Sequence, residues 1–358
     1  MIRYLRQEEK RRTLPLWREA FYQDSEAFLE YYYREKTRDN RILAKVEEET
    51  GRIVSMVHRN PYRVQAGEMA WDIDYVVAAA TTKDRQRQGL MRGLLTRMME
   101  DMYGEEMGFC FLMPADVKIY EPFDFVTICE QPSLKLNPKG ERELKAERLA
   151  DDGRDKERAA RWMDRWLMER YQVFARRTPE YVGRLLGELA SEDGWMEFLT
   201  ISHPVDQGKE RGRDEIQGIR CWWGLGEKEQ RMLLAGDVWT KPADRKPPLI
   251  MARIIHLKKF LTAIRLCPGS GKEHCLSVRL KVEDSLCRDN EGTFLWVIDR
   301  ETSRLFSWED NMKVQVSLKI TIAELTGWLF GRGTGLCGEN PWMREVQVLD
   351  RIFLDEIV

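Results

Sequence analysis

The sequence contains no apolar run close to the ~20 residues that a membrane-spanning helix needs. Its first residues, MIRYLRQEEKRR, also lack the apolar core of a signal peptide. The 358 residues are 43% hydrophobic and 33% charged, as in an ordinary soluble globular protein. We therefore expect a cytoplasmic protein without a membrane partner, whose length suggests two or three domains.

The sequence also has no large excess of positive or negative charge, and it contains few cysteines and histidines. The formal net charge is only −2, so no overall field favours nucleic acid. The seven cysteines are an odd number and form no Cys-x-x-Cys pair, which indicates reduced thiols. The four histidines show no metal-binding spacing, so we predict no metal site.

Residues 76–92, VVAAATTKDRQRQGLMR, are the most informative segment. A short apolar run precedes a basic turn, and a segment of helical periodicity follows Gly89. This order places unpaired backbone N–H groups at a helix N-terminus, which favours a phosphate anion. Gly89 would let the backbone approach such a ligand closely because it has no Cβ.

The turn Gln86–Met91 resembles the pyrophosphate loop of the GCN5-related N-acetyltransferases, Gln/Arg-x-x-Gly-x-Gly/Ala, although Met91 is bulkier than that pattern. Residues 113–125, MPADVKIYEPFDF, resemble the acceptor-side segment of the enhanced-intracellular-survival-type branch. Members of this branch tolerate a bulky residue where Met91 stands. Residues 16–33 and the final FLDEIV resemble the same branch. The resemblance covers the whole length but is sharp only over the first third and the last few residues.

Periodicity predicts a mixed α/β arrangement in the first part of the chain. Apolar residues at helical spacing after Gly89, many of them methionines, predict a helix that packs one face on a sheet. We expect helices over residues 15–36 and 89–103, and strands over residues 42–47, 53–62, 71–81, 109–113 and 126–129.

The rest of the chain changes character at residues 131–140, where Pro and Gly indicate a first boundary. Residues 141–191 are predicted to be helical, with a solvated face of mixed charge. We expect strands over 195–201, 218–224 and 230–236, a polar loop at 206–214 and a linker at 241–248. Further on we expect antiparallel strands at 276–282 and 292–299, a strand at 313–320, and a helix from a capping box at Thr321 to Phe330.

The resemblance implies the fold and the domains. It predicts two tandem GCN5-related acetyltransferase folds, each a mixed sheet flanked by helices, and a sterol-carrier-protein-like α+β domain. The catalytic domain would span residues 1–132 and the second, non-catalytic one residues 133–250. The last would span residues 251–358 and end in the C-terminal carboxylate. By resemblance the chain would assemble as a homohexamer.

The implied reaction transfers an acetyl group from acetyl-CoA to a primary amine, which must lose a proton before it attacks. In the family pattern a tyrosine is the general acid, and it corresponds to Tyr120. The chain's own terminal carboxylate, here that of Val358, would be the base. The acceptor is an aminoglycoside-like or polyamine-like amine or a lysine, which the sequence does not decide.

Cofactor contacts follow from the same resemblance. Backbone groups of one strand end would pair with the pantetheine arm, the turn would wrap the pyrophosphate, and two residues would lie near the thioester. These residues are Ala79, Ala80 and Thr81; Arg87, Gln88, Gly89, Leu90, Met91 and Arg92; and Ala115 and Asp116, where the family often has Ser-Glu.

Several alternatives stay open. Asp24, Glu26 and Glu30, near Trp17, Phe21 and Phe28, could hold a polycationic amine or could simply be helix-surface acids. The protein could be a non-enzymatic carrier with a vestigial acetyltransferase fold, and Met91 favours this. It could also be an interaction module that uses the charged residues 141–177.

Overall fold

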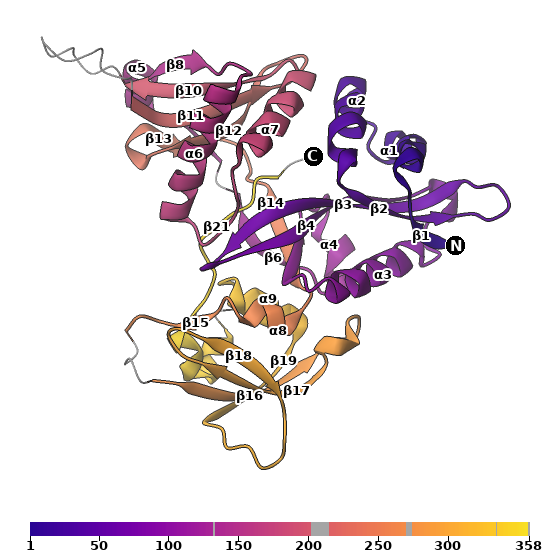
Figure 1. Cartoon of the computed structure of the whole chain (residues 1–358), viewed down its shortest axis with the longest axis vertical. Helices are drawn as coiled ribbons and strands as arrows, with labels where there is room; N and C mark the ends of the chain where they lie inside the picture. The colour runs from indigo at the N-terminus through magenta and orange to yellow at the C-terminus, as the bar shows by residue number, and fades with distance from the viewer. Residues whose placement is uncertain (132, 202–214, 270–273, 334, 357–358) are drawn as a thin grey trace, which may run out of the picture.

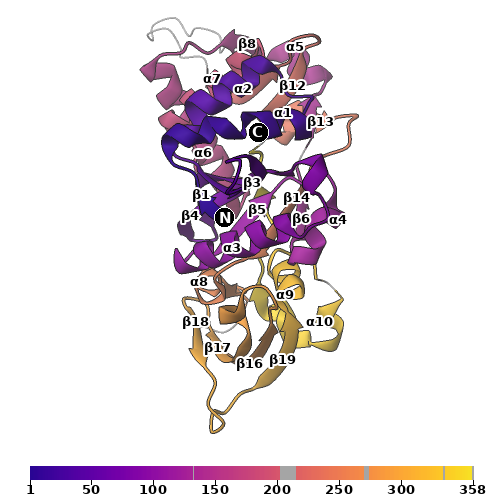
Figure 2. The ribbon, with the colours of Figure 1, turned by 90° about the vertical axis from the view of Figure 1, so that its right-hand side faces the viewer.

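The structure is a computed structural model that describes residues 1–131, 133–201, 215–269, 274–333 and 335–356. The chain forms three parts stacked along its long axis (Figures 1 and 2). The first part lies in the middle, a second part above it carries α6 and α7, and the last part lies below.

The middle part is built on a mixed sheet of order β1-β2-β3-β4-β5-β14-β6. Neighbouring strands are antiparallel except β4 and β5, which are parallel. The strands are β1 (Ile2–Tyr4), β2 (Arg41–Val46), β3 (Ile53–Ala66), β4 (Met69–Thr81), β5 (Phe109–Leu112), β6 (Val126–Glu130) and β14 (Leu249–Ile254). The strands expected in this part are therefore confirmed.

Two short strands from later in the sequence extend this sheet. β9 (Val173–Ala175) pairs antiparallel with β3, and β21 (Ile352–Phe353) pairs parallel with β9. The sheet thus combines segments from the whole chain, and β14 crosses the expected boundary at 250/251. The domain limits at 132/133 and 250/251 stay predictions.

Helices cover both faces of this sheet. α1 (Leu14–Ala20) and α2 (Glu26–Glu35) pack on one face, and α3 (Leu90–Gly104) packs on the other, with α4 (Val117–Tyr120) beside it. Neighbouring residues of β2 point to opposite faces, since Ile42 contacts the first cluster and Leu43 the second. The expected methionine stripe is buried in α3, as Met98, Met99 and Met102.

The upper part has a second sheet of order β12-β11-β10-β8, with helices α6 and α7 on its apolar face. Its elements are α5 (Pro138–Glu143), β8 (Lys145–Arg148), α6 (Gly153–Arg170), α7 (Pro179–Ser191), β10 (Trp195–Ile201), β11 (Glu215–Trp223) and β12 (Glu229–Ala235), and the pair β7 (Leu134–Leu136) and β13 (Thr240–Pro242). The expected strands here are confirmed, and the loop predicted at 206–214 lies outside the described residues.

The prediction of helix throughout residues 141–191 was wrong at two places. Residues 145–148 form β8, which pairs with β10, and residues 173–175 form β9, which pairs with β3. Both are short strands that gain their hydrogen bonds from partners far along the chain, so local periodicity does not reveal them. The linker expected at 241–248 likewise begins in β13.

The lower part is a sheet of order β18-β17-β16-β19 with helices packed on it. Its elements are α8 (Leu257–Leu261), β15 (Arg265–Leu266), β16 (Leu276–Glu283), β17 (Gly292–Ile298), β18 (Ser303–Ser307), β19 (Val316–Thr321), α9 (Ile322–Leu329), α10 (Leu336–Glu339) and β20 (Val346–Gln347). The antiparallel pair β16–β17 is confirmed. The capping box at Thr321 and Glu324 is confirmed too.

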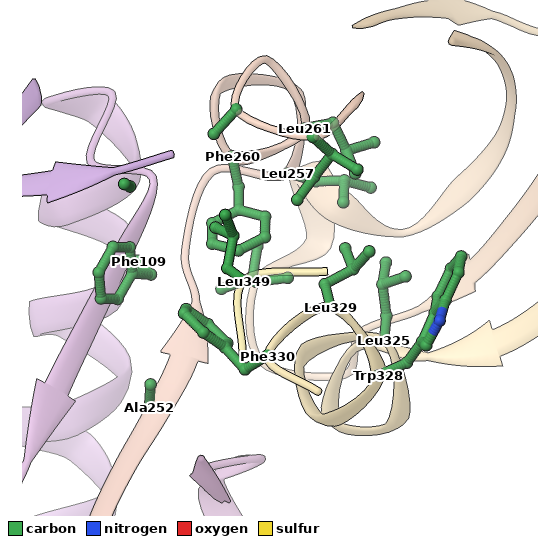
Figure 3. Packing of buried hydrophobic residues seen from close by; sticks show 14 of the residues in the cluster. Phe109, Ala252, Leu257, Phe260, Leu261, Leu325, Trp328, Leu329, Phe330 and Leu349 are labelled. Carbon is green, nitrogen blue, oxygen red and sulfur yellow. The ribbon is translucent and has the colours of Figure 1, made fainter. Parts of the chain in front are cut away.

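The lower and middle parts share one hydrophobic core (Figure 3). Phe330 follows α9 and is only 1% exposed. Its ring centroid lies 5.3 Å from that of Phe109 on β5 and 5.3 Å from that of Phe260 on α8. This ring contacts both parts and therefore packs the lower part against β5 of the central sheet.

None of the helices in the described part of the chain is both long and apolar enough to cross a membrane.

Replacing Phe330 by alanine should therefore destabilise the whole chain. We expect Phe330→Ala to lower the free energy of unfolding by about 3–5 kcal/mol, the usual cost of removing a buried phenyl ring. The matched control is Phe306→Ala, since Phe306 is 45% exposed and should change stability by less than ~0.5 kcal/mol. Urea unfolding followed by tryptophan fluorescence measures both, and equal effects would contradict the shared core.

Candidate active site

The parallel strands β4 and β5 pair at only one position, Tyr75 with Phe111. Beyond Tyr75, β4 continues to Thr81 and keeps its antiparallel partner β3. Within the described residues, no strand pairs with the other edge of β4 over this stretch. The free edge therefore offers backbone N–H and C=O groups to a ligand that binds as an extra strand.

A bulge lies in this stretch of β4, in its pairing with β3 on the opposite edge. The register with β3 shifts between Met56, which pairs with Ala80, and His58, which pairs with Val77. Ala78 adopts a φ of 51°, which is unusual for a residue with a Cβ. Bulges bend a strand and redirect its groups, and they are frequent next to active sites. The segment predicted to hold the cofactor arm, Ala79 to Thr81, follows directly.

The basic turn connects this strand end to α3. After the short helix η3 (Lys83–Arg85), Arg87 has a φ of 61° and Gly89 a φ of 75°. Gly89 is the N-cap of α3, and no side chain caps the helix. A Cβ built on Gly89 would meet nothing within 4 Å, so the space in front of the helix is open. The first N–H groups of α3 thus face an open position suited to an anion.

Ion pairs anchor the turn and leave two arginines for a ligand. Arg52 pairs with Asp84 at 3.0 Å, and Arg85 pairs with Glu47 at 2.7 Å. Arg87 and Arg92 are exposed and have no carboxylate within 4.0 Å among the described residues. The guanidinium of Arg92 lies 5.1 Å from the ring centroid of Phe123. These two cations can therefore balance the charge of an anion at the helix end.

The remaining residues of the turn have structural contacts. The side-chain amides of Gln86 and Gln88 donate to the carbonyl oxygens of Thr81 and Asp84, both at 3.4 Å. Leu90 is half-buried, and Met91 packs against the α3 core. The bulky side chain of Met91 is thus accommodated by the core beside α3.

Tyr120 is the last residue of α4, the short helix that follows β5. It is half-buried, and its ring lies 6.0 Å from that of Phe125. Burial raises the pKa of Tyr120 above its ordinary 10.0, so its hydroxyl keeps its proton at neutral pH. Ala115 and Asp116 are exposed in the preceding turn, where the Asp116 carboxylate caps α4 by accepting from the N–H of Lys118 at 3.0 Å.

Tyr75, at the point where the strands separate, lies close to several parts of the chain. Burial is the main cause that raises the pKa of Tyr75, and the nearby Tyr62, Glu356 and Tyr120 raise it further. The ring of Tyr62 on β3 is 6.4 Å from that of Tyr75. Tyr120 from α4 and Glu356 from the C-terminal segment therefore both lie close enough to Tyr75 to raise its pKa.

The C-terminal segment reaches this region from the lower part. After β21, Leu354, Asp355 and Glu356 are at most 5% exposed. Glu356 lines a cavity of about 30 Å³ together with Tyr62. Burial raises the pKa of Glu356, and the adjacent Arg177 opposes this rise. The predicted base, Val358, lies outside the described residues.

The acids in α2 and in the turn between α1 and α2 are engaged in local contacts. Asp24 accepts from the indole nitrogen of Trp17 at 2.7 Å, and burial raises the pKa of its carboxyl. Glu26 pairs with Arg18 at 2.6 Å, and Glu30 pairs with Arg11. Phe21 and Phe28 pack with Trp17 in the core beside α1 and α2. Glu26 and Glu30 are therefore surface acids with arginine partners.

Among the described residues, no group of three His, Cys, Asp or Glu side chains could hold a metal ion.

Comparisons with known proteins agree with this geometry. Residues 1–128 match the family model described as Acetyltransferase (GNAT) domain. The N-terminal third of this chain is therefore similar to GNAT acetyltransferase domains. The match supports an acyltransferase enzyme. No curated protein matches the sequence.

Solved structures match the chain over its length. A GCN5-related N-acetyltransferase from Kribbella flavida is 12% identical with a TM-score of 0.76, covering 100% of this chain and 98% of that one. A probable N-acyltransferase from Enterococcus faecalis is 15% identical with a TM-score of 0.73, covering 100% and 99%. Eis1 from Mycobacterium abscessus is 14% identical with a TM-score of 0.62, covering 97% and 93%. At this identity the likeness establishes a shared fold.

Gly89→Ala should weaken binding of coenzyme A while the protein stays folded. The new Cβ would occupy the open position in front of α3, so we expect the Kd to rise by about tenfold or more. The left-handed backbone should cost about 1 kcal/mol of stability.

The matched control for this variant is Gly104→Ala at the opposite end of α3. A Cβ at Gly104 also meets nothing within 4 Å, and this glycine has no positive φ. Its coenzyme A affinity should not change, as titration calorimetry would reveal. Unchanged affinity of Gly89→Ala would contradict an anion site at this turn.

Proposed function

We propose that the protein is an acetyl-CoA-dependent N-acetyltransferase that acts on primary amines. The observation that carries this proposal is the pairing of β4 and β5 at Tyr75 and Phe111 alone, beside an uncapped helix N-terminus at Gly89. In this proposal the pantetheine arm pairs with Ala79–Thr81, the pyrophosphate lies at Arg87–Arg92, and the thioester points toward Tyr120.

The chemistry requires a neutral amine and a proton for the leaving thiolate. Tyr120 is suited to donate that proton, because burial keeps its hydroxyl protonated. N–H groups on the free edge of β4 can donate to the thioester oxygen as negative charge develops there. We propose direct transfer from the thioester to the amine, with the Val358 terminal carboxylate as the base and no metal ion.

The finer features of the resemblance complete this proposal. They are the enhanced-intracellular-survival type, a non-catalytic second acetyltransferase-like fold at 133–250, a sterol-carrier-like fold at 251–358 and a cytoplasmic homohexamer. The acceptor would be an aminoglycoside-like or polyamine-like amine or a lysine, with Ala115 and Asp116 near the thioester. Sedimentation equilibrium would test the hexamer.

The test of the function is release of free thiol from acetyl-CoA across a panel of amines. We expect amine-dependent thiol release and a product heavier by one acetyl group. If no amine raises thiol release above the rate with buffer alone, the proposal is wrong, and a carrier without acetyl-CoA affinity becomes the better account.

Tyr120→Phe should lower kcat by about 10²–10³-fold and leave the Kd for acetyl-CoA unchanged, because only the acidic hydroxyl is lost. In the wild type the Tyr120 hydroxyl keeps its proton at neutral pH, because burial raises its pKa above 10.0. Activity should therefore fall as the pH is lowered from neutral, because the amine and the base then gain protons. The control is Tyr103→Phe, since Tyr103 on α3 stacks on His256 away from the opening. Near-normal turnover of Tyr120→Phe would exclude the role of this hydroxyl.

Extending the chain after Val358 by a short Gly-Ser tail should also impair turnover, because it moves the terminal carboxylate away. We expect a loss of kcat of about 10²-fold at unchanged acetyl-CoA affinity. The same tail placed before Met1 is the control. Full activity of the C-terminal extension would remove the terminal carboxylate from the mechanism.

A further inference from the structure

A small cavity lies beside the point where β4 and β5 separate. Its volume is about 30 Å³, and Tyr62 on β3 lines it. The ring centroid of Tyr62 lies 6.4 Å from that of Tyr75 and 6.5 Å from that of Phe111. Tyr75 and Phe111 are the pair beyond which the two strands separate. The ring of Tyr62 therefore connects the cavity with the opening where the thioester is proposed to lie.

Four side chains that line this cavity each have one buried polar atom without a hydrogen-bond partner among the described residues. They are two carboxylate oxygens and two N–H donors, namely Glu188 Oε1, Glu356 Oε2, Asn60 Nδ2 and Arg231 Nε. All four residues are at most 6% exposed. Because buried polar atoms without partners are rare in folded proteins, four of them around one cavity indicate a polar ligand.

Other polar atoms of the same side chains are bonded, which fixes their orientation. Oε1 of Glu356 accepts from Nη1 of Arg177 at 2.8 Å and from the hydroxyl of Tyr181 at 3.2 Å. Nη2 of Arg231 donates to the carbonyl oxygen of Asp355 at 2.6 Å. The unpaired oxygen of Glu356 and the unpaired N–H of Arg231 are therefore held in place by the bonded half of each group.

The charges around the cavity are balanced. Three cations and three anions line it, namely Lys36, Arg184, Arg231, Asp39, Glu188 and Glu356. Lys36 pairs with Glu188 at 3.2 Å, and Arg184 pairs with Asp39 at 2.7 Å. A further cation would be costly to bury here, because no net negative charge compensates it. An ammonium group also only donates hydrogen bonds, so it would leave the two N–H donors unsatisfied.

We propose that this cavity binds a neutral hydroxyl group of the amine acceptor. A hydroxyl both donates and accepts hydrogen bonds, so it can pair with a carboxylate oxygen and with an N–H donor of the same cavity. A volume of about 30 Å³ is also enough for a group the size of a water molecule. This inference rests on the proposed function and narrows its substrate class, since it favours an amino alcohol over a polyamine.

Matched acceptors test this inference. The compounds 4-amino-1-butanol, butylamine and 1,4-diaminobutane share one carbon chain and differ only at its far end. We expect kcat/KM for the amino alcohol to exceed each of the other two values by at least about tenfold, because a buried hydrogen-bonding site rejects ligands that leave it unpaired. The compounds 6-amino-1-hexanol, hexylamine and 1,6-diaminohexane repeat the comparison at greater length. Equal values within both sets, or a preference for the diamines, would overturn the inference.

Lys36→Met tests the argument from charge. Methionine is unbranched but uncharged, so the carboxylate of Glu188 loses its ion pair and the cavity gains net negative charge. We expect the ratio of kcat/KM for the amino alcohol to that for the diamine to fall by at least about tenfold. The control is Lys319→Met, since Lys319 pairs with Glu283 at 2.7 Å in the lower part, and its ratio should equal that of the wild type.

An unchanged ratio in folded Lys36→Met would overturn the inference, and if this variant does not fold, the wild-type comparison carries the test. Calorimetry separates the inference from the proposed function. Titration with 4-amino-1-butanol should give a Kd at least about tenfold lower than titration with butylamine, whether or not an acetyl group is transferred. Equal affinities would overturn the hydroxyl site alone. Absence of turnover with every amine would overturn the proposed function instead.

Discussion

The separation of β4 from β5 beyond the pair Tyr75–Phe111 is the constraint on which the candidate site depends. Strands in the interior of a sheet normally satisfy both edges, so an open edge there leaves backbone groups for a ligand. The bulge at Ala78 and the turn to Gly89 follow on the same segment. One stretch of backbone therefore supplies both a strand-like edge and a helix N-terminus.

The other two parts of the chain support this opening from outside. The lower part packs α8 and α9 against the central sheet through Phe330. The upper part contributes β9 to the sheet and Arg177 to the C-terminal segment. The last described residues lie beside Tyr62, and contacts with Gln131, Arg177 and Arg231 hold Leu354–Glu356 there.

Local signals in the sequence were sufficient for the backbone elements that form the candidate site. The apolar run, the basic turn and Gly89 predicted the strand, the turn after it and α3, because backbone requirements leave direct traces in composition. The capping box at Thr321 was predictable for the same reason. By contrast, β9 and β21 are strands of three and two residues whose existence depends on partners elsewhere in the chain.

The contacts of Arg177 and Arg231 could not be predicted from the sequence. Both arginines lie in charge-rich segments where most side chains are solvated, and nothing local distinguishes a buried arginine from an exposed one. Their partners follow 178 and 124 positions later. Met91 is a different case: its size departs from the family pattern, yet its side chain packs beside α3. The size of the side chain at position 91 therefore does not indicate whether the space beside Gly89 is open.

The most direct test of the account is a crystal structure of the protein with coenzyme A bound. The account predicts the diphosphate at the N–H groups of residues 89–92 and the pantetheine arm along Ala79–Thr81, paired with the free edge of β4. Coenzyme A bound elsewhere, or that edge occupied by the protein's own side chains at saturating coenzyme A, would contradict it.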